Sequence, residues 1–81
     1  MVEFFRGAVD GATKVNTLPQ GGVIYLQTDQ EITIEFWNPA AGAYGAAETI
    51  AVPGDEISCP SNKARLTNTG SAANVTISAG S

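Results

Sequence analysis

Residues 31–37, EITIEFW, carry the pattern that decides the fold of this chain. Apolar residues stand at every second position of the stretch, and most of the positions between them are polar. Successive side chains of a β-strand point to opposite faces, whereas a helix would repeat about every 3.6 residues. β-Branched and aromatic residues also suit a pleated surface. The stretch therefore predicts a half-buried strand with Ile32, Ile34 and Phe36 facing inward, and with Glu31, Thr33, Glu35 and Trp37 facing outward.

The most apolar run of the chain, residues 23–27 (VIYLQ), lies just before this strand. It is rich in strand-forming residues and short for a helix. Residues 28–30 link it to residues 32–37, so we expect the two runs to pair as an antiparallel hairpin.

A second hairpin is expected near the C-terminus, between residues 63–68 and residues 74–78. Both runs alternate in polarity, and residues 69–73 between them contain Gly and Ser, which are typical of turns. On one face of this hairpin we expect Leu66, Val75 and Ile77, and on the other Arg65, Thr67, Asn74, Thr76 and Ser78.

The segment at residues 38–47 is rich in alanine but does not predict a helix. Pro39 removes a backbone donor, and glycines in a helix interior each cost about 1 kcal/mol relative to alanine. We expect a loop between two strands, in which Tyr44 returns to pack near Trp37.

Four other short runs have extended character, and turn residues such as the Asp10-Gly11 pair separate the runs from one another. With the two hairpins, they amount to seven or eight short strands at spacings of roughly 8–12 residues. The expected fold is therefore all-β, a small antiparallel sandwich or barrel formed by one domain over residues 1–81, with residues 1–9 as an edge strand or an N-terminal arm. The four runs are residues 2–9, 13–18 (with Val15 inward), 48–52 and 55–59.

Composition limits how such a small domain is stabilised. The chain has 81 residues, no histidine and a single cysteine, Cys59, so neither an internal disulfide nor a zinc site is expected. Small β domains often depend on disulfides, metals or neighbouring subunits. Only 15% of the residues are charged, against about 25% in typical domains, and small neutral residues replace them. We therefore expect neighbouring subunits, in a homo-oligomer.

The charge pattern argues against nucleic acid and membrane partners. The net charge is −4, and the four basic residues do not form a run that would attract a phosphate backbone. No apolar run has membrane-spanning length, and the N-terminus lacks the basic-then-apolar order of a signal peptide. We expect a protein made and assembled in a cytoplasm.

Catalytic chemistry has little support in the sequence. Glu31 and Glu35 share a strand face but lie about 13 Å apart, and a glycosidase pair needs about 5–10 Å. Cys59 has no histidine to activate it. The glycine pairs lack the strand–loop–helix context of a phosphate site. We therefore predict a non-enzymatic protein with no catalytic residues, no cofactor and no metal site.

Aromatic residues are the candidate contact residues. Trp37 stands on the polar face of its strand, before the loop that carries Tyr44, and such aromatics either cover a sheet edge, anchor a protein interface or stack on a sugar. Phe4 and Phe5 are adjacent, so strict alternation would point them to opposite faces of a strand. One of them would then need a second apolar surface, which a subunit contact would supply. The interface residues predicted are Phe4, Phe5, Trp37 and Tyr44.

Residues 64–70 (ARLTNTG) followed by residues 74–78 (NVTIS) look like the closing hairpin of many viral β-sandwiches. In size and composition the whole chain resembles the small all-β decoration (cement) and accessory proteins of tailed-bacteriophage virions, which are similarly short, acidic, histidine-free and rich in Ala, Gly and Thr. The resemblance implies a structural protein on the virion capsid surface, often a trimer at three-fold positions, that contacts the major capsid protein or other virion proteins. The alternative is a small carbohydrate- or receptor-binding β module, such as one from a phage tail or surface protein.

Overall fold

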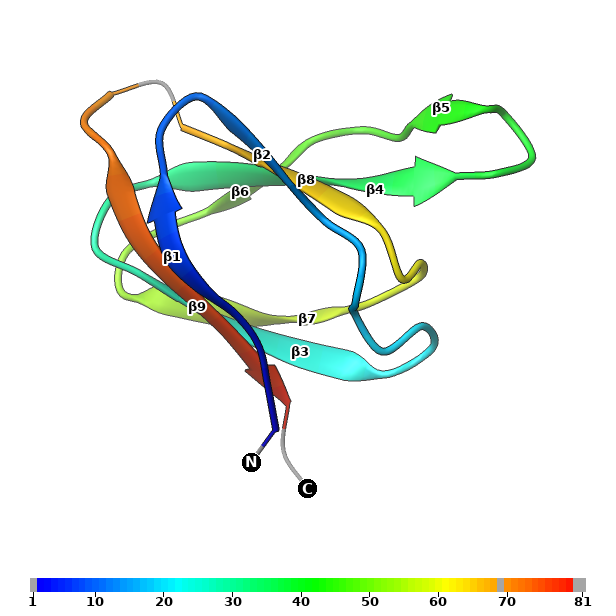
Figure 1. Ribbon diagram of the computed structural model, residues 1–81, viewed down its shortest axis with the longest axis horizontal. Coiled ribbons are helices and arrows are strands. Elements are labelled where there is room, and N and C mark those ends of the chain that lie inside the picture. The colour runs from blue at the N-terminus through cyan, green and yellow to red at the C-terminus, as the bar shows by residue number, and fades with distance from the viewer. Residues whose placement is uncertain (1, 69, 80–81) are drawn as a thin grey trace.

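The computed structural model describes residues 2–68 and 70–79, and these residues form nine strands and no helix (Figure 1). All strand pairs are antiparallel, and the strands belong to two sheets that enclose one core. The predicted all-β antiparallel fold is confirmed, and of the two expected forms, sandwich or barrel, its two sheets make it a sandwich, with nine strands in the described residues where the sequence indicated seven or eight. The strands are β1 (Val2–Val9), β2 (Ala12–Val15), β3 (Val23–Thr28), β4 (Ile32–Asn38), β5 (Ala43–Tyr44), β6 (Glu48–Ile50), β7 (Gly54–Ser58), β8 (Ala64–Thr67) and β9 (Ala73–Ala79).

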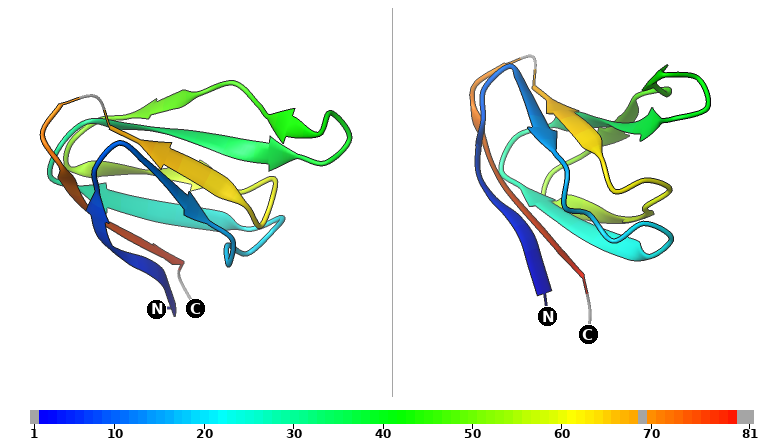
Figure 2. Two further views of the ribbon diagram at one scale, coloured as in Figure 1. Left: turned by 45° about the horizontal axis from the view of Figure 1, so that its top comes forward. Right: turned by 45° about the vertical axis from the view of Figure 1, so that its right-hand side comes forward.

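The first sheet has the order β1-β9-β3-β7, and the second has the order β2-β8-β4-β5, with β6 also paired to β4. Strand β4 is long enough for two partners on one side. Its beginning pairs with β6, with Ile32 opposite Ile50, and its end pairs with β5, with Trp37 opposite Tyr44. The two views of Figure 2 show the sheets as separate layers, with the β4–β5 hairpin extending beyond the other strands.

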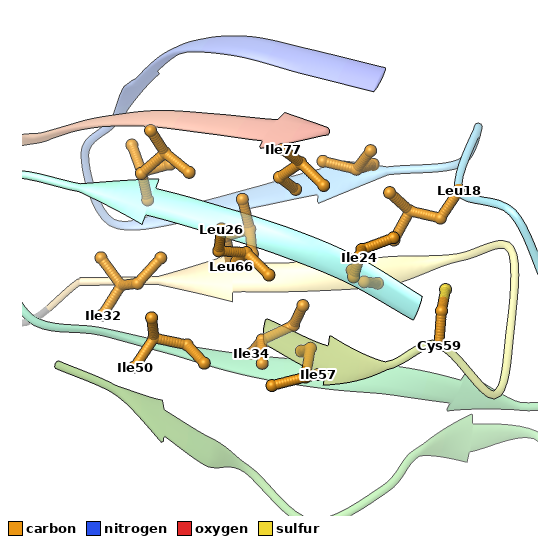
Figure 3. Close-up of a cluster of buried hydrophobic side chains, with 14 of the residues drawn as sticks. Leu18, Ile24, Leu26, Ile32, Ile34, Ile50, Ile57, Cys59, Leu66 and Ile77 are labelled. Atoms are coloured by element: carbon orange, nitrogen blue, oxygen red, sulfur yellow. The ribbon is translucent and has the colours of Figure 1, made fainter. Parts of the chain in front are cut away.

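The core lies between the sheets and consists of the residues that alternation places inward. Strand β4 contributes the buried residues Ile32 and Ile34, and β3 contributes Ile24 and Leu26 (Figure 3). Full burial of such a side chain contributes about 1.5–3 kcal/mol relative to exposure. The remaining members of the cluster are Val9, Val15, Leu18, Ile50, Ile57, Cys59, Ala64, Leu66, Ala73, Val75 and Ile77.

The predicted hairpin between residues 23–27 and 32–37 is wrong. Strand β3 pairs with β7 and β9, whereas β4 pairs with β5, β6 and β8. A tight hairpin turn needs residues with positive φ, usually glycine. Residues 29–31 contain no glycine, and none of the described non-glycine residues has a positive φ. The chain therefore arches from one sheet to the other, so that the apolar faces of both strands enter the same core.

The predicted C-terminal hairpin is also wrong, because β8 and β9 lie in different sheets. The inward face was predicted correctly, since Leu66, Val75 and Ile77 are all buried. Ser78 was expected on the outer face, yet it is only 6% exposed, at a position opposite Glu3 of β1 and Tyr25 of β3. Residue 69 of the predicted turn lies outside the described residues.

Asn68 connects the turn between β1 and β2 to the segment after β8. The backbone N–H of Gly11 donates to its side-chain oxygen Oδ1 at 3.2 Å, and its own backbone N–H donates to the Gly11 carbonyl at 3.0 Å. Its side-chain Nδ2 donates to the Ser71 carbonyl. These bonds hold two connections that cross between the sheets at the same end of the sandwich.

Strand β1 is an edge strand of the first sheet, so residues 2–9 do not form a detached arm. Its register against β9 shifts between Glu3 and Phe5, which leaves Phe4 as an extra residue. A β-bulge of this kind interrupts strict alternation. Phe4 and Phe5 both pack against the core as half-buried residues. The bulge therefore removes the reason for expecting a second apolar surface beside one of them.

Candidate functional site

The outer face of the second sheet carries a row of three charged side chains. Arg65 on β8 lies opposite Lys14 of β2 on one side and opposite Glu35 of β4 on the other. The residues before and after Arg65, Ala64 and Leu66, are buried in the core, so the alternating positions face outward. The strand register alone therefore brings together residues that are 30 or more positions apart in the chain.

A second row, two residues further along, contains the aromatic residues. The Trp37 backbone N–H donates to the Lys63 carbonyl at 2.9 Å, which places Lys63 beside the tryptophan. On its other side Trp37 pairs with Tyr44. Lys63 directly precedes β8, and Asn16 directly follows β2. Both residues therefore lie at the same end of the paired strands β2 and β8, in the second row.

The local sequence explains why Tyr44 returns to Trp37. The Asn38 side-chain oxygen accepts hydrogen bonds from the N–H groups of Ala40 and Ala41, a pattern in which asparagine favours a turn. Gly42 then adopts a φ of 65°, which glycine tolerates without a steric cost. The expected loop over residues 38–47 thus contains a two-residue strand, and the predicted packing of Tyr44 near Trp37 is confirmed.

The side chains of this face contact one another closely. The Trp37 and Tyr44 ring centroids are 5.2 Å apart with an interplanar angle of 77°, a favourable edge-to-face arrangement. The guanidinium carbon of Arg65 lies 4.5 Å from the Tyr44 ring centroid, within range of a cation–π interaction. Arg65 also donates three hydrogen bonds to the Glu35 carboxylate, from Nε to Oε1 at 3.1 Å and from Nη2 to each of the two oxygens at 3.0 Å, and these bonds raise the pKa of Arg65. Glu35 therefore balances the positive charge of Arg65, and Glu35 and Tyr44 together hold its side chain in place.

A shallow hollow of about 280 Å³ lies on this face, close to the lower limit of roughly 300 Å³ for small-molecule sites. The two lysines that line it, Lys14 and Lys63, have no ion-pair partner within residues 2–68 and 70–79. We call this feature the basic hollow. It is lined by Lys14, Asn16, Trp37, Tyr44 and Lys63.

A second depression, of about 440 Å³, is lined mostly by residues of β4 and of the segments that flank β5, and it shares only Trp37 with the basic hollow. Its lining is mainly apolar, with two prolines and one half-buried phenylalanine. We call it the apolar groove. It is lined by Phe36, Trp37, Asn38, Pro39, Gly45, Ala46 and Pro60.

The four predicted interface residues do not form one surface. Trp37 and Tyr44 meet on the outer face of the second sheet, whereas Phe4 and Phe5 pack against the core from the first sheet. Sequence reasoning missed Lys14, Lys63 and Arg65 at this site. Alternation places Arg65 and Lys63 on one face of their strand, but only the pairing of β8 with β4 brings them to the aromatic pair.

Residues considered for catalysis take ordinary structural roles. Glu35 is bound to Arg65, and the buried Cys59 thiol donates to the Ser61 carbonyl at 3.0 Å. Burial raises the pKa of Cys59, and a raised pKa lowers the thiolate fraction. In the described part of the chain, no three His, Cys, Asp or Glu side chains come together in the manner of metal ligands. Within the same residues, no helix is long and apolar enough to cross a membrane.

Comparisons with protein-family models, with curated proteins and with solved structures found no match.

Proposed function

We propose that this chain is a non-enzymatic structural virion protein, a capsid decoration (cement) protein that stabilises a phage head through protein–protein contacts. The proposal rests on the resemblance in size and composition and on one structural observation. The β4–β5 hairpin extends beyond the body of the sandwich (Figure 2). It carries Trp37, which lines the apolar groove, and Tyr44, which packs against Trp37.

The chemistry of this region suits a protein contact. Interface centres are enriched in aromatic residues, and energetically important residues fill apolar pockets surrounded by a polar rim. Here Trp37 stands between the apolar groove and the basic hollow, and Lys63 and Arg65 provide charged groups beside it. The hairpin is also held rigid by the Asn38 turn, which lowers the entropy lost when a partner binds.

A trimer is the expected assembly, with the major capsid protein or other virion proteins as the partner. Many copies on one particle make weak individual contacts effective, because linked binding sites raise the effective concentration of each contact. A modest apolar area at each hairpin is then sufficient.

The test compares Tyr44→Ala with Tyr25→Ala, a tyrosine on the other sheet that is 38% exposed. Solution mass is measured by size-exclusion chromatography with light scattering across a dilution series, and particle binding by co-sedimentation with capsids of the source virus. We expect the unmodified chain to give a trimer of about 25 kDa, from a chain mass of 8.3 kDa, and to co-sediment with capsids. Tyr44→Ala and Trp37→Ala should weaken assembly or capsid binding while Tyr25→Ala does not. Normal assembly and capsid binding by both hairpin variants would refute the role given to the hairpin.

A further inference from the structure

We propose that the basic hollow binds an acidic saccharide of the uronic acid class, that is, a sugar bearing a carboxylate. This inference goes beyond the structural role proposed above and does not depend on it. It rests on the placement of charge, on the aromatic rings and on the size of the hollow.

Positive charge is concentrated on this face of an otherwise acidic protein. The chain has only four basic residues and a net charge of −4, yet Lys14, Lys63 and Arg65 all lie on the outer face of the second sheet. The Glu35 carboxylate neutralises Arg65. The two lysines remain as uncompensated charges that line the same hollow, which is the local potential that a carboxylate needs.

Aromatic rings provide the second part of the site. Trp37 and Tyr44 are half-buried and stand nearly perpendicular to each other, so together they form an angled wall. Aromatic faces on an outer surface stack on sugar rings through apolar contacts. Arg65 and the strand pairing fix the position of Tyr44, so this wall exists before a ligand arrives. Asn16 supplies an amide with donors and an acceptor for sugar hydroxyls.

The chemistry favours a short acidic saccharide over the other acidic ligands. A nucleic acid strand follows a continuous basic track with successive stacking platforms, whereas here two free lysines adjoin one aromatic corner on an acidic protein. A peptide of acidic residues alone would satisfy the lysines but offers no sugar ring whose C–H face could pack on the aromatic corner. In the proposed complex the ligand carboxylate lies between Lys14 and Lys63, and one sugar ring packs into the corner of Trp37 and Tyr44.

Trp37 is the only tryptophan, so its fluorescence reports on the hollow directly. The experiment titrates the purified protein with oligogalacturonate and with a neutral galactose oligosaccharide of the same length, which lacks the carboxylates. The site variant is Lys14→Gln with Lys63→Gln. The matched control is Arg6→Gln with the same charge change per substitution, because Arg6 lies on β1 in the other sheet and pairs with Glu3.

We expect saturable binding of oligogalacturonate that weakens as salt is added, with no binding of the neutral sugar. Loss of the two charge-assisted contacts should weaken the affinity by at least about tenfold in the double variant, while Arg6→Gln binds normally. Asn16→Asp, which places a negative charge in the hollow, provides a second variant and should also weaken binding. A lack of binding, equal binding of the neutral sugar, an unchanged affinity in the lysine variants, or preferential binding of a poly-glutamate peptide would each overturn the proposal.

Discussion

Replacing Gly54 with alanine should strongly destabilise the sandwich, because a Cβ at Gly54 would run into the backbone of the paired strand β3. A Cβ at this position would lie 1.9 Å from the carbonyl oxygen of Leu26 and 2.9 Å from its carbonyl carbon. The atoms in its way belong to the backbone of the paired strand, so no side-chain rotation relieves the clash. Gly54 also has a φ of +144°, a conformation that residues with a Cβ rarely adopt.

The expected cost follows from these two contributions. Restoring an ordinary contact distance would require the strands to separate by about 1.5 Å, which breaks the pairing of Gly54 with Gln27. Losing one or two backbone hydrogen bonds costs about 0.5–1.5 kcal/mol each, and a strained backbone conformation costs about 1–3 kcal/mol. We therefore expect Gly54→Ala to lower the free energy of unfolding by about 1.5–6 kcal/mol, out of roughly 4–12 kcal/mol for a domain of this size.

Urea unfolding followed by Trp37 fluorescence and by circular dichroism measures this change. Gly70→Ala is the matched control, because an added Cβ at Gly70 meets no atom within 4 Å and its φ is not in the positive region. A loss of 2 kcal/mol would lower the melting temperature by at least about 8 °C. If Gly54→Ala is as stable as Gly70→Ala, then β7 does not approach Leu26 and the pairing of β3 with β7 is incorrect.

Three further predictions concern the core, the pH dependence and the cysteine. Leu66→Ala should lower the free energy of unfolding by about 2–5 kcal/mol, because it leaves a cavity in the core. Val52 is 53% exposed, so Val52→Ala should change the free energy of unfolding by no more than about 0.5 kcal/mol. Equal losses for the two variants in urea unfolding would contradict the assignment of Leu66 to the core. The Asp29 carboxylate accepts hydrogen bonds from the backbone N–H and side chain of Asn74, and these bonds lower the pKa of Asp29. Its contribution to stability is therefore present above the unfolded-state pKa of about 4 and is lost as the pH falls through the lower folded-state pKa. Asp29→Asn should reduce the fall in the urea midpoint between neutral and acidic pH, and an unchanged pH profile would show that this carboxylate does not contribute. The buried Cys59 thiol, whose pKa burial raises, should react with a thiol reagent only after unfolding in urea; rapid labelling of the native protein would contradict its burial.

The structure also shows why the aromatic pair could be predicted from the sequence while the three cations beside it could not. Trp37 and Tyr44 lie seven residues apart, and the turn that joins them is encoded locally by Asn38 and Gly42, so their contact was predictable. Lys14 and Lys63 are 49 positions apart and reach the same hollow only because β8 lies between β2 and β4. A scan for basic runs cannot find such a cluster.

The sequence by itself determined the all-β class, most strand positions and the direction in which most side chains face. Ile32, Ile34, Leu66, Val75 and Ile77 were all expected inward and are all buried. This information is local, because side chains of a strand alternate with a period of two whatever the neighbouring strand is.

Strand partners were decided only by the tertiary structure. Most consecutive strands lie in different sheets, since only β4, β5 and β6 follow one another within one sheet. Both predicted hairpins were therefore wrong, although their inward faces were right. The physical reason is that the apolar face of a strand can be buried in two ways. Two consecutive strands can pair as a hairpin that another sheet covers, or they can lie in different sheets whose apolar faces pack against each other. The alternating pattern is the same in both cases, and long-range packing of the core selects between them.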